Sequence, residues 1–245
     1  MTAFFRALST EWLKLRRTLA FWMIVVAPLI VVLLQFFIGY DRMKVPENIQ
    51  AWPMFVQSSC ALWAIFMMPL YITLETALLN NIEHSAKSWK QLFALPVPRA
   101  SLVAAKMLTS FLMIGLSTVI LCVAIVVFGK LLSFLRPQFL MEGIPLELIA
   151  TKAFLPFVAS WLIIAIHSWI SARWQGFALS LGIGIGAVFF AVFASGARAG
   201  AFYPWLFPLN SLGDERSFIA LTVGSIGGIL FAAFATWDVT RRDVL

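Results

Sequence analysis

Few residues of this sequence have types and spacings that could perform chemistry. His167 and Ser168 are adjacent within an apolar run, and adjacent residues of a helix do not face each other, so a Ser–His catalytic pair is not expected. We expect His167 to make a hydrogen bond between helices instead. Cys60 and Cys122 both lie in apolar runs, and they predict neither a disulfide framework nor a metal site.

Glu75 is the only acid well within an apolar run. A charge in the middle of a bilayer costs about 2.5–3.5 kcal/mol on insertion scales, so such a residue needs a compensating interaction. Glu75 lies near the inner end of its apolar stretch, and this position leaves two interpretations. Its carboxylate reaches the membrane interface, or it pairs with a base such as Lys106.

The sequence carries no nucleotide-binding loop. Its only Gly-Lys pair, Gly129–Lys130, has no upstream glycine at Walker spacing and is followed by Leu131. The string GIGIG at 182–186 lacks the strand–turn–helix context of a dinucleotide site. We therefore expect that the chain is not an enzyme by itself, and that it holds no metal and no cofactor.

Composition indicates what must surround these residues. The 245 residues are 62% hydrophobic and only 12% charged, whereas a soluble domain is about 45–50% apolar and about 25% charged. A soluble fold of this size could not bury so much apolar surface, so the class is integral membrane protein. The net charge of +7 comes from bases that adjoin apolar runs, which is typical of membrane topology rather than of nucleic-acid binding.

Six apolar stretches are long enough to cross a hydrocarbon core about 30 Å thick. The fold class is therefore all-α, with about six transmembrane helices in a single transmembrane domain over residues 1–245. Pro28, Pro69 and Pro156 fall inside these stretches, where neighbouring helices can satisfy the freed carbonyl groups. The predicted spans lie near 19–39, 55–79, 101–132, 154–172, 177–195 and 218–237.

The distribution of Lys and Arg predicts the orientation. With both termini in the cytoplasm, the inner segments hold 11 of the 18 basic residues and the outer segments hold 7. The outer bases are also accompanied by acids such as Asp41, Glu142 and Asp214. We therefore expect both termini to be cytoplasmic.

Residues 1–17 predict an amphipathic helix in the inner interface of the membrane. Phe4, Leu8, Trp12 and Leu15 recur at helical spacing and line one face, with bases on the other faces. Such a helix is either a topology anchor in contact with lipid headgroups or an interface helix that also contacts a cytoplasmic partner.

The longest cytoplasmic connection, NNIEHSAKSWKQLFALPVPRASLVAAK at 80–106, predicts a short helix with one basic and one apolar side. Pro96 and Pro98 end that helix, and Arg99 and Lys106 flank the return into the membrane. Two interpretations remain open. The segment is an ordinary positive-inside loop, or it is a helix parallel to the membrane that transmits force from a soluble motor.

Two pairs of glycines at four-residue spacing predict close helix packing. They are Gly182/Gly186 in the fifth predicted span and Gly224/Gly228 in the sixth. Packing within the subunit is the favoured interpretation, and a dimer contact or a moving gate is the alternative.

The connection at 80–106 resembles the ABC type-2 exporter permeases, through its acid, Trp-Lys pair, Leu, Pro-x-x-Arg and following Lys. The opening LSTEWLKLRRTLAFWMIVVAPL is similar to the branch that contains bacitracin-resistance and lantibiotic-immunity permeases. In that branch a Glu-x-x-Lys-x-(Lys/Arg)-(Lys/Arg) pattern leads into the first span. Glu11, Lys14, Arg16 and Arg17 fill those positions.

This resemblance implies a permease subunit of an ABC exporter in a bacterial cytoplasmic (inner) membrane. Its partners would be a separate ABC ATPase that binds ATP and Mg²⁺, a second permease subunit of the same or a related chain, and membrane lipid. The segment 80–100 would be the coupling helix that docks on the ATPase. The residues implied to face the ATPase, or to fix the elbow beside it, are Glu83, Lys87, Trp89, Lys90, Leu92, Phe93, Pro96 and Arg99.

Because few charges line the spans, we expect an amphipathic or hydrophobic substrate, such as a peptide antibiotic or a lipid-like molecule. Two other classes remain as alternatives. An ion-coupled secondary transporter would carry charges near the midplane and two related halves. An intramembrane enzyme would need facing catalytic groups or metal ligands.

Overall fold

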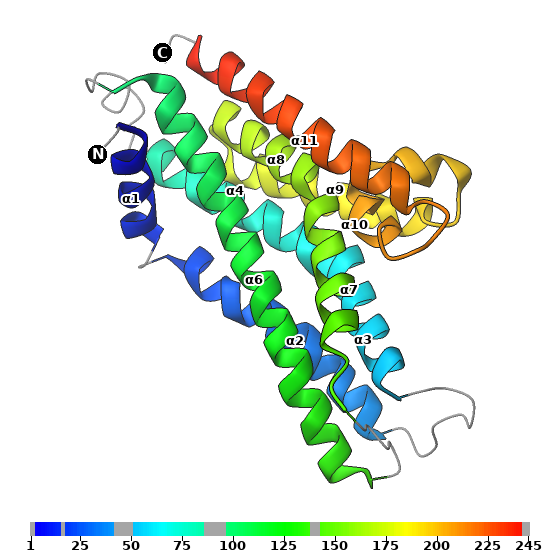
Figure 1. Cartoon of the computed structure of the whole chain (residues 1–245). Helices are drawn as coiled ribbons and strands as arrows, with labels where there is room; N and C mark the ends of the chain where they lie inside the picture. Colours follow the sequence, from blue (N-terminus) through cyan, green and yellow to red (C-terminus); the bar gives the residue numbers. More distant parts are fainter. Residues whose placement is uncertain (1–2, 16–17, 42–50, 86–96, 138–142, 242–245) are drawn as a thin grey trace.

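The protein is an elongated bundle of helices (Figure 1). The structure is a computed structural model that describes residues 3–15, 18–41, 51–85, 97–137 and 143–241 of the 245-residue chain. Its longer helices are α1 (Ala3–Leu15), α2 (Leu19–Asp41), α3 (Ala51–Leu62), α4 (Met68–Ser85), α6 (Arg99–Leu135), α7 (Leu146–Ala159), α8 (Trp161–Arg173), α9 (Phe177–Ala194) and α11 (Ser217–Thr240). The shorter elements are the π-helix η1 (Trp63–Met67), the 3-10 helices η3 (Arg198–Phe202) and η4 (Pro204–Leu206), and α10 (Phe207–Asn210).

By length and composition, five helical stretches within the described ranges can cross a membrane, or six when the bent pair α7–α8 counts as one span. No described residue lies in a β-strand. Both findings confirm an all-α integral membrane protein. The start of α1 and the end of α11 lie on the same side of the bundle, as an even number of crossings requires (Figure 1).

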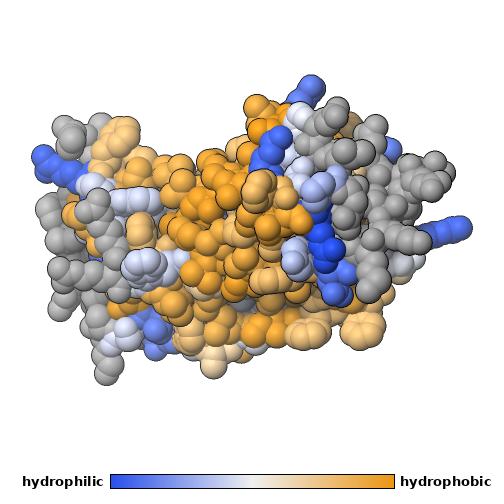
Figure 2. Space-filling model, turned by 90° about the horizontal axis from the view of Figure 1, so that it is seen from below, coloured by the Kyte–Doolittle hydropathy of each residue, from blue (hydrophilic) through white to orange (hydrophobic). Residues whose placement is uncertain are grey.

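The outer surface of the bundle suits a lipid environment. Large apolar side chains such as Phe134, Phe193 and Phe218 are exposed. Apolar residues form a broad band across the middle of the face in Figure 2, and hydrophilic residues gather toward its two ends. Lipid is the solvent in which such a band is stable, because lipid tails are as apolar as the side chains that meet them.

The second span combines α3, η1 and α4 into one stretch of 35 residues. In η1 the chain makes a wider turn, and the N–H of Met68 donates to the carbonyl of Trp63, five residues earlier. Pro69 follows immediately, and proline has no N–H to donate. The wider turn therefore adjoins the one position of this stretch that cannot continue the α-helical hydrogen bonds unchanged.

The fourth predicted span is broken rather than continuous. We predicted one helix near 154–172, but α7 and α8 meet at Ser160 with a bend of 42°. Pro156 cannot donate a hydrogen bond, and the Ser160 hydroxyl donates to the carbonyl of Phe157 at 2.7 Å. These two side chains disturb the helical hydrogen bonds at the bend, although the N–H of Ser160 still donates to the carbonyl of Pro156 at 3.0 Å.

The last helix packs its glycines against this break. A Cβ atom on Gly224 would lie 2.4 Å from the carbonyl oxygen of Ala159, and one on Gly228 would lie 2.7 Å from the backbone of Trp161. Only glycine allows the backbones of α11 and α8 to come this close. The predicted close packing of Gly224 and Gly228 within the subunit is confirmed.

The predicted close packing of Gly182 and Gly186 within the subunit is wrong. Nothing lies within 4 Å of a Cβ placed on Gly182 or Gly186. The glycine of α9 that packs closely is Gly184, where a Cβ would lie 2.2 Å from the side chain of Thr73 on α4. Positions 182 and 186 share a helix face with each other but not with position 184, so α9 is turned away from the predicted orientation.

Two helices extend beyond their predicted bounds. The second span was predicted to end near residue 79, but α4 continues to Ser85, and the third begins at Arg99 and ends at Leu135. At about 1.5 Å per residue, the 37 residues of α6 measure about 55 Å, which exceeds a hydrocarbon core about 30 Å thick. Both helices therefore carry charged residues on turns beyond the apolar core.

Candidate functional site

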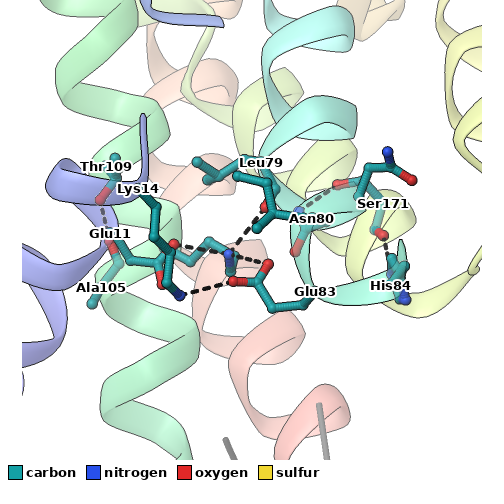
Figure 3. A network of polar contacts seen from close by, with 12 residues as sticks. Glu11, Lys14, Leu79, Asn80, Glu83, His84, Ala105, Thr109 and Ser171 are labelled. Carbon is teal, nitrogen blue, oxygen red and sulfur yellow. Dashed lines mark hydrogen bonds and ion pairs between the residues drawn. The ribbon is translucent and has the colours of Figure 1, made fainter. Parts of the chain in front are cut away.

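Four charged side chains form a closed ring where α1, α4 and α6 meet (Figure 3). Lys14 Nζ lies 2.7 Å from Glu11 Oε1 and 2.9 Å from Glu83 Oε1. Lys106 Nζ lies 2.8 Å from Glu11 Oε2 and 2.7 Å from Glu83 Oε2. Each carboxylate thus gives one oxygen to each lysine, and the four charges cancel. We call these residues the charge ring.

Each helix brings its member to the ring by ordinary helical spacing. Glu11 and Lys14 are three residues apart on α1 and therefore share one side of that helix. Glu83 lies in the last turn of α4. Lys106 lies seven residues after Arg99, about 10 Å along α6, and the apolar stem of a lysine lets its ammonium group reach across.

Most of the charge ring is removed from solvent. The side chains of Glu11, Glu83 and Lys106 are 8%, 1% and 8% exposed, whereas that of Lys14 is 26% exposed. Burial alone would raise the pKa of Glu11, but the charges of Lys106 and Lys14 and their hydrogen bonds hold it below its ordinary value. Burial alone would lower the pKa of Lys14, but its hydrogen bonds to Glu11 and Glu83 raise it. Both shifts favour the charged forms.

Further hydrogen bonds connect the charge ring to α8. Lys106 Nζ also donates to the carbonyl of Leu79 at 3.1 Å. One turn away, the amide nitrogen of Asn80 donates to the Ser171 hydroxyl at 2.8 Å, and the His84 ring lies 2.9 Å from the Ser171 carbonyl (Figure 3). The end of α4 is therefore joined by polar contacts to α1, α6 and α8 at once.

Glu75 follows neither of the two interpretations that its sequence position left open. It is fully buried, so its carboxyl does not reach the interface. It also forms no ion pair with Lys106, which among the described residues is paired with the carboxylates of Glu11 and Glu83. The sequence shows only that an acid and a base lie in neighbouring spans, and three acids lie within reach of one lysine.

The predicted coupling residues fall into three groups in the structure. Glu83 was expected to begin a separate helix, but it lies in α4 with its carboxylate bonded to two lysines of this chain. That Glu83 faces an ATPase stays a prediction. Arg99 is exposed at the first turn of α6, and its role at the elbow stays a prediction. The others lie outside the described residues: Lys87, Trp89, Lys90, Leu92, Phe93 and Pro96.

His167 makes contacts between helices, as predicted. The indole N–H of Trp205 donates to His167 Nε2 at 3.2 Å, and the Thr73 hydroxyl lies 3.3 Å from the same nitrogen. Because Nε2 accepts from the indole, the ring proton is assigned to Nδ1. The Ser168 hydroxyl has no hydrogen-bond partner among the described residues, so it does not bond to the neighbouring His167.

One further ion pair was missed by sequence reasoning. Asp238 Oδ2 on α11 accepts from Arg173 at 2.8 Å and from the indole of Trp169 at 2.8 Å, both on α8. An acid in the last turns of an apolar helix, on the side of the membrane where bases are most frequent, is the signal that could have indicated this pair.

An apolar groove lies between helices α6, α8 and α11. It has a volume of about 480 Å³. Phe111, Trp161 and Gly228 are among its walls. No group of three or more potential metal ligands occurs in the described part of the chain.

Comparison with curated proteins finds no significant match for the chain. The sequence model of a family described as "ABC-2 family transporter protein" does match it, over residues 7–194. This match covers well over half of the 245 residues and includes all four members of the charge ring. An all-helical membrane bundle whose sequence matches that model over such a length belongs to the ABC-2 family of transporter proteins.

Proposed function

We propose that this chain is the permease of an exporter for amphipathic or hydrophobic molecules, driven by a separate ATPase that docks between α4 and α6. Membership of the ABC-2 family makes the chain a membrane component of an ABC transporter. In our proposal the ATPase binds ATP and Mg²⁺. Its movements reach the membrane domain through the segment around Trp89, which connects the two helices.

The charge ring is the observation that carries this proposal. The segment between Ser85 and Arg99 is attached to the end of α4 and the start of α6, and the ring bonds both helices to α1. A force on that segment would therefore act on three helices together rather than on one flexible loop. Buried ion pairs suit this task because separating them is costly.

The proposed topology follows from the positions of the basic residues. Both ends of the described chain lie on one side of the bundle, together with the charge ring (Figures 1 and 3). The excess of Lys and Arg in the segments of this side favours the cytoplasm, so we propose a bacterial cytoplasmic membrane with both termini inside. A second permease subunit, of this or a related chain, would complete the transport pathway.

The apolar groove supports the proposed kind of substrate. Its volume lies within the range of about 300–1,000 Å³ that is typical of sites for small ligands. Its walls are built almost wholly from apolar side chains such as Leu108, Phe111 and Ile229. A peptide antibiotic or a lipid-like molecule would present matching apolar surface, and removing such antibiotics from the cell would give resistance to them.

Replacing Trp89 by alanine tests the proposed coupling. In the purified complex with the companion ATPase, we expect Trp89→Ala to keep ATP hydrolysis but to lose most substrate transport into vesicles. The matched control is Trp237→Ala, which removes an exposed tryptophan from α11 and should leave both rates unchanged. Unchanged transport by Trp89→Ala, or failure to find any ATPase bound to the full-length chain, would contradict the proposal.

A further inference from the structure

A second polar cluster lies between α4 and α6, two helical turns from Glu83. Glu75 is fully buried, and neither of its carboxyl oxygens has a hydrogen-bond partner among the described residues. The hydroxyl groups of Ser110 and Tyr71 lie near this carboxyl, and each is buried with no hydrogen-bond partner among the described residues. Buried polar groups without partners are rare in native proteins, so three together require an explanation.

The neighbouring lysine is already occupied. An ammonium group has three protons to donate, and those of Lys106 go to Glu11, Glu83 and the carbonyl of Leu79. The charge ring as a whole holds two acids and two bases, so its charge is balanced without Glu75. A negative charge on Glu75 would therefore have no counter-ion there.

The other elements packed against α4 do not supply one either. Neither α9 nor η1 contains a titratable side chain, and those of α2 are Tyr40 and Asp41, at the end far from the ring. From α8, His167 is bonded to Trp205, and Arg173 is bonded to Asp238. The titratable groups of α4, α6 and α8 are Tyr71, Glu75, Glu83, His84, Arg99, Lys106, Cys122, Lys130, His167 and Arg173.

An unpaired carboxylate at this depth would cost several kcal/mol, and a buried acid avoids that cost by binding a proton. We propose that Glu75 is a proton-binding site: it holds a proton while the charge ring is closed, and releases it to become the counter-ion of Lys106 when the ring opens. On release the O–H bond breaks, its electron pair stays on the carboxylate, and the proton passes to water through the opened ring.

The register of α4 and α6 permits this exchange of partners. Lys106 donates to the carbonyl of Leu79, and Leu79 is one turn from Glu75 on α4. On α6, Ser110 is one turn from Lys106 and interacts with Glu75. One helical turn is about 5.4 Å, a distance that the flexible stem of a lysine can span. A motion that separates both α1 and the last turn of α4 from α6 would remove Glu11 and Glu83 from Lys106 and leave Glu75, two turns before Glu83, as the next acid.

Infrared spectroscopy of the full-length protein in detergent tests the resting state. A protonated carboxyl group gives a carbonyl band that shifts in D₂O, and we expect this band at neutral pH in the wild type and its loss in Glu75→Gln. Glu147→Gln, which removes an exposed acid of α7, is the control and should leave the band in place. Absence of the band from the wild type would show an ionised Glu75, held by water or a cation, and would overturn the proposal.

The double variant Glu11→Gln, Glu83→Gln tests the exchange, because it leaves Lys106 without either of its ring acids. We expect the Glu75 band to disappear in this background as Glu75 ionises. In Lys106→Met, where no lysine needs a counter-ion, the band should remain. A band that persists in the double variant would overturn the exchange.

Unfolding temperatures test the exchange independently. They can be measured on variants that keep Glu11, so the test also works if the double variant Glu11→Gln, Glu83→Gln is too unstable to purify. Glu75→Gln should leave the unfolding temperature of the wild type nearly unchanged, because glutamine replaces a neutral acid of similar shape. In the background of Glu83→Gln, which keeps Glu11, adding Glu75→Gln should clearly lower the unfolding temperature. Equal effects of Glu75→Gln in both backgrounds would contradict a role for Glu75 as the counter-ion of Lys106.

Discussion

The two lysines of the charge ring make matching contacts in different surroundings. Both donate to Glu11 and Glu83 at 2.7–2.9 Å, but Lys106 is almost fully buried, whereas about a quarter of Lys14 remains exposed. Water and salt screen an exposed charge, so the loss of Lys14 is partly compensated. The loss of Lys106 would instead leave two buried carboxylates with only the partly exposed Lys14 between them.

We therefore predict unequal losses of stability for the two methionine variants. Lys106→Met should lower the free energy of unfolding by about 3–5 kcal/mol, as expected when one partner of a buried ion pair is removed. Lys14→Met should cost clearly less. Denaturant titration in detergent, followed by tryptophan fluorescence, measures both, and equal losses would show that burial does not set the strength of the ring.

For individual residues, the sequence identified the members of the charge ring better than it predicted which of them bond to each other. Glu11, Lys14, Glu83 and Lys106 were all identified as notable residues, and His167 was expected to bond between helices, as it does. The sequence left open a pairing of Lys106 with Glu75, but the structure pairs Lys106 with Glu83, which lies two turns further along the same helix, and with Glu11. A choice between Glu75 and Glu83 depends on where α1 adds a third acid, and sequence spacing carries no such information.

Among the elements, glycine decides how closely α11 approaches the break between α7 and α8. The backbones of Ala159 and Trp161 lie where the side chains of residues 224 and 228 would have to be. At Gly186 on α9 the same space is open. The two helices thus offer a matched comparison of one substitution in filled and in empty surroundings.

We predict that Gly224→Ala destabilises the protein and that Gly186→Ala does not. A methyl group at position 224 must displace backbone of α7, and overpacking of this kind costs about 1–3 kcal/mol. Thermal unfolding of both variants in detergent measures the difference. A Gly224→Ala variant as stable as the wild type would mean that α11 can move away from the break without loss.

The elements themselves were largely predictable, and their ends and faces were not. Hydropathy finds the apolar part of a span, so α4 and α6 were predicted too short where polar turns such as that of Glu83 continue the helix. The break at Ser160 was missed because apolar residues run through it without interruption. The choice between Gly182 and Gly184 as the packed position depends on helix rotation, which three alternate glycines in a row do not reveal.

For the whole molecule, the arrangement of the helices makes the sidedness testable. Ser85, at the end of α4, and Asp214, between α10 and α11, are both exposed, and our topology assigns them to opposite sides of the membrane. In a background without Cys60 and Cys122, we predict that a membrane-impermeant maleimide labels Asp214→Cys in intact spheroplasts. Ser85→Cys should react only after the cells are opened.

The reverse pattern of labelling would place the charge ring outside the cell and exclude docking of a cytosolic ATPase beside it. Composition alone was sufficient to predict a membrane bundle, and the even number of predicted spans was sufficient to predict that both ends share one side. The identity of that side is a property of the cell rather than of the packed helices, so only an experiment of this kind determines it.

The π-helix η1 affects how the charge ring responds to mutations that change the length of the second span. One more residue is wound into that turn than an α-helix would hold, so deleting a single residue from Trp63–Met67 would restore regular winding. Because the wide turn absorbs the extra residue, everything beyond it would keep close to its present orientation relative to the outer half of the span. A deletion in the regular helix between η1 and Glu75 would instead rotate Glu75 and Glu83 together by about 100°. The wide turn is therefore the part of this span where the chain can lose one residue without turning these two acids away from α6.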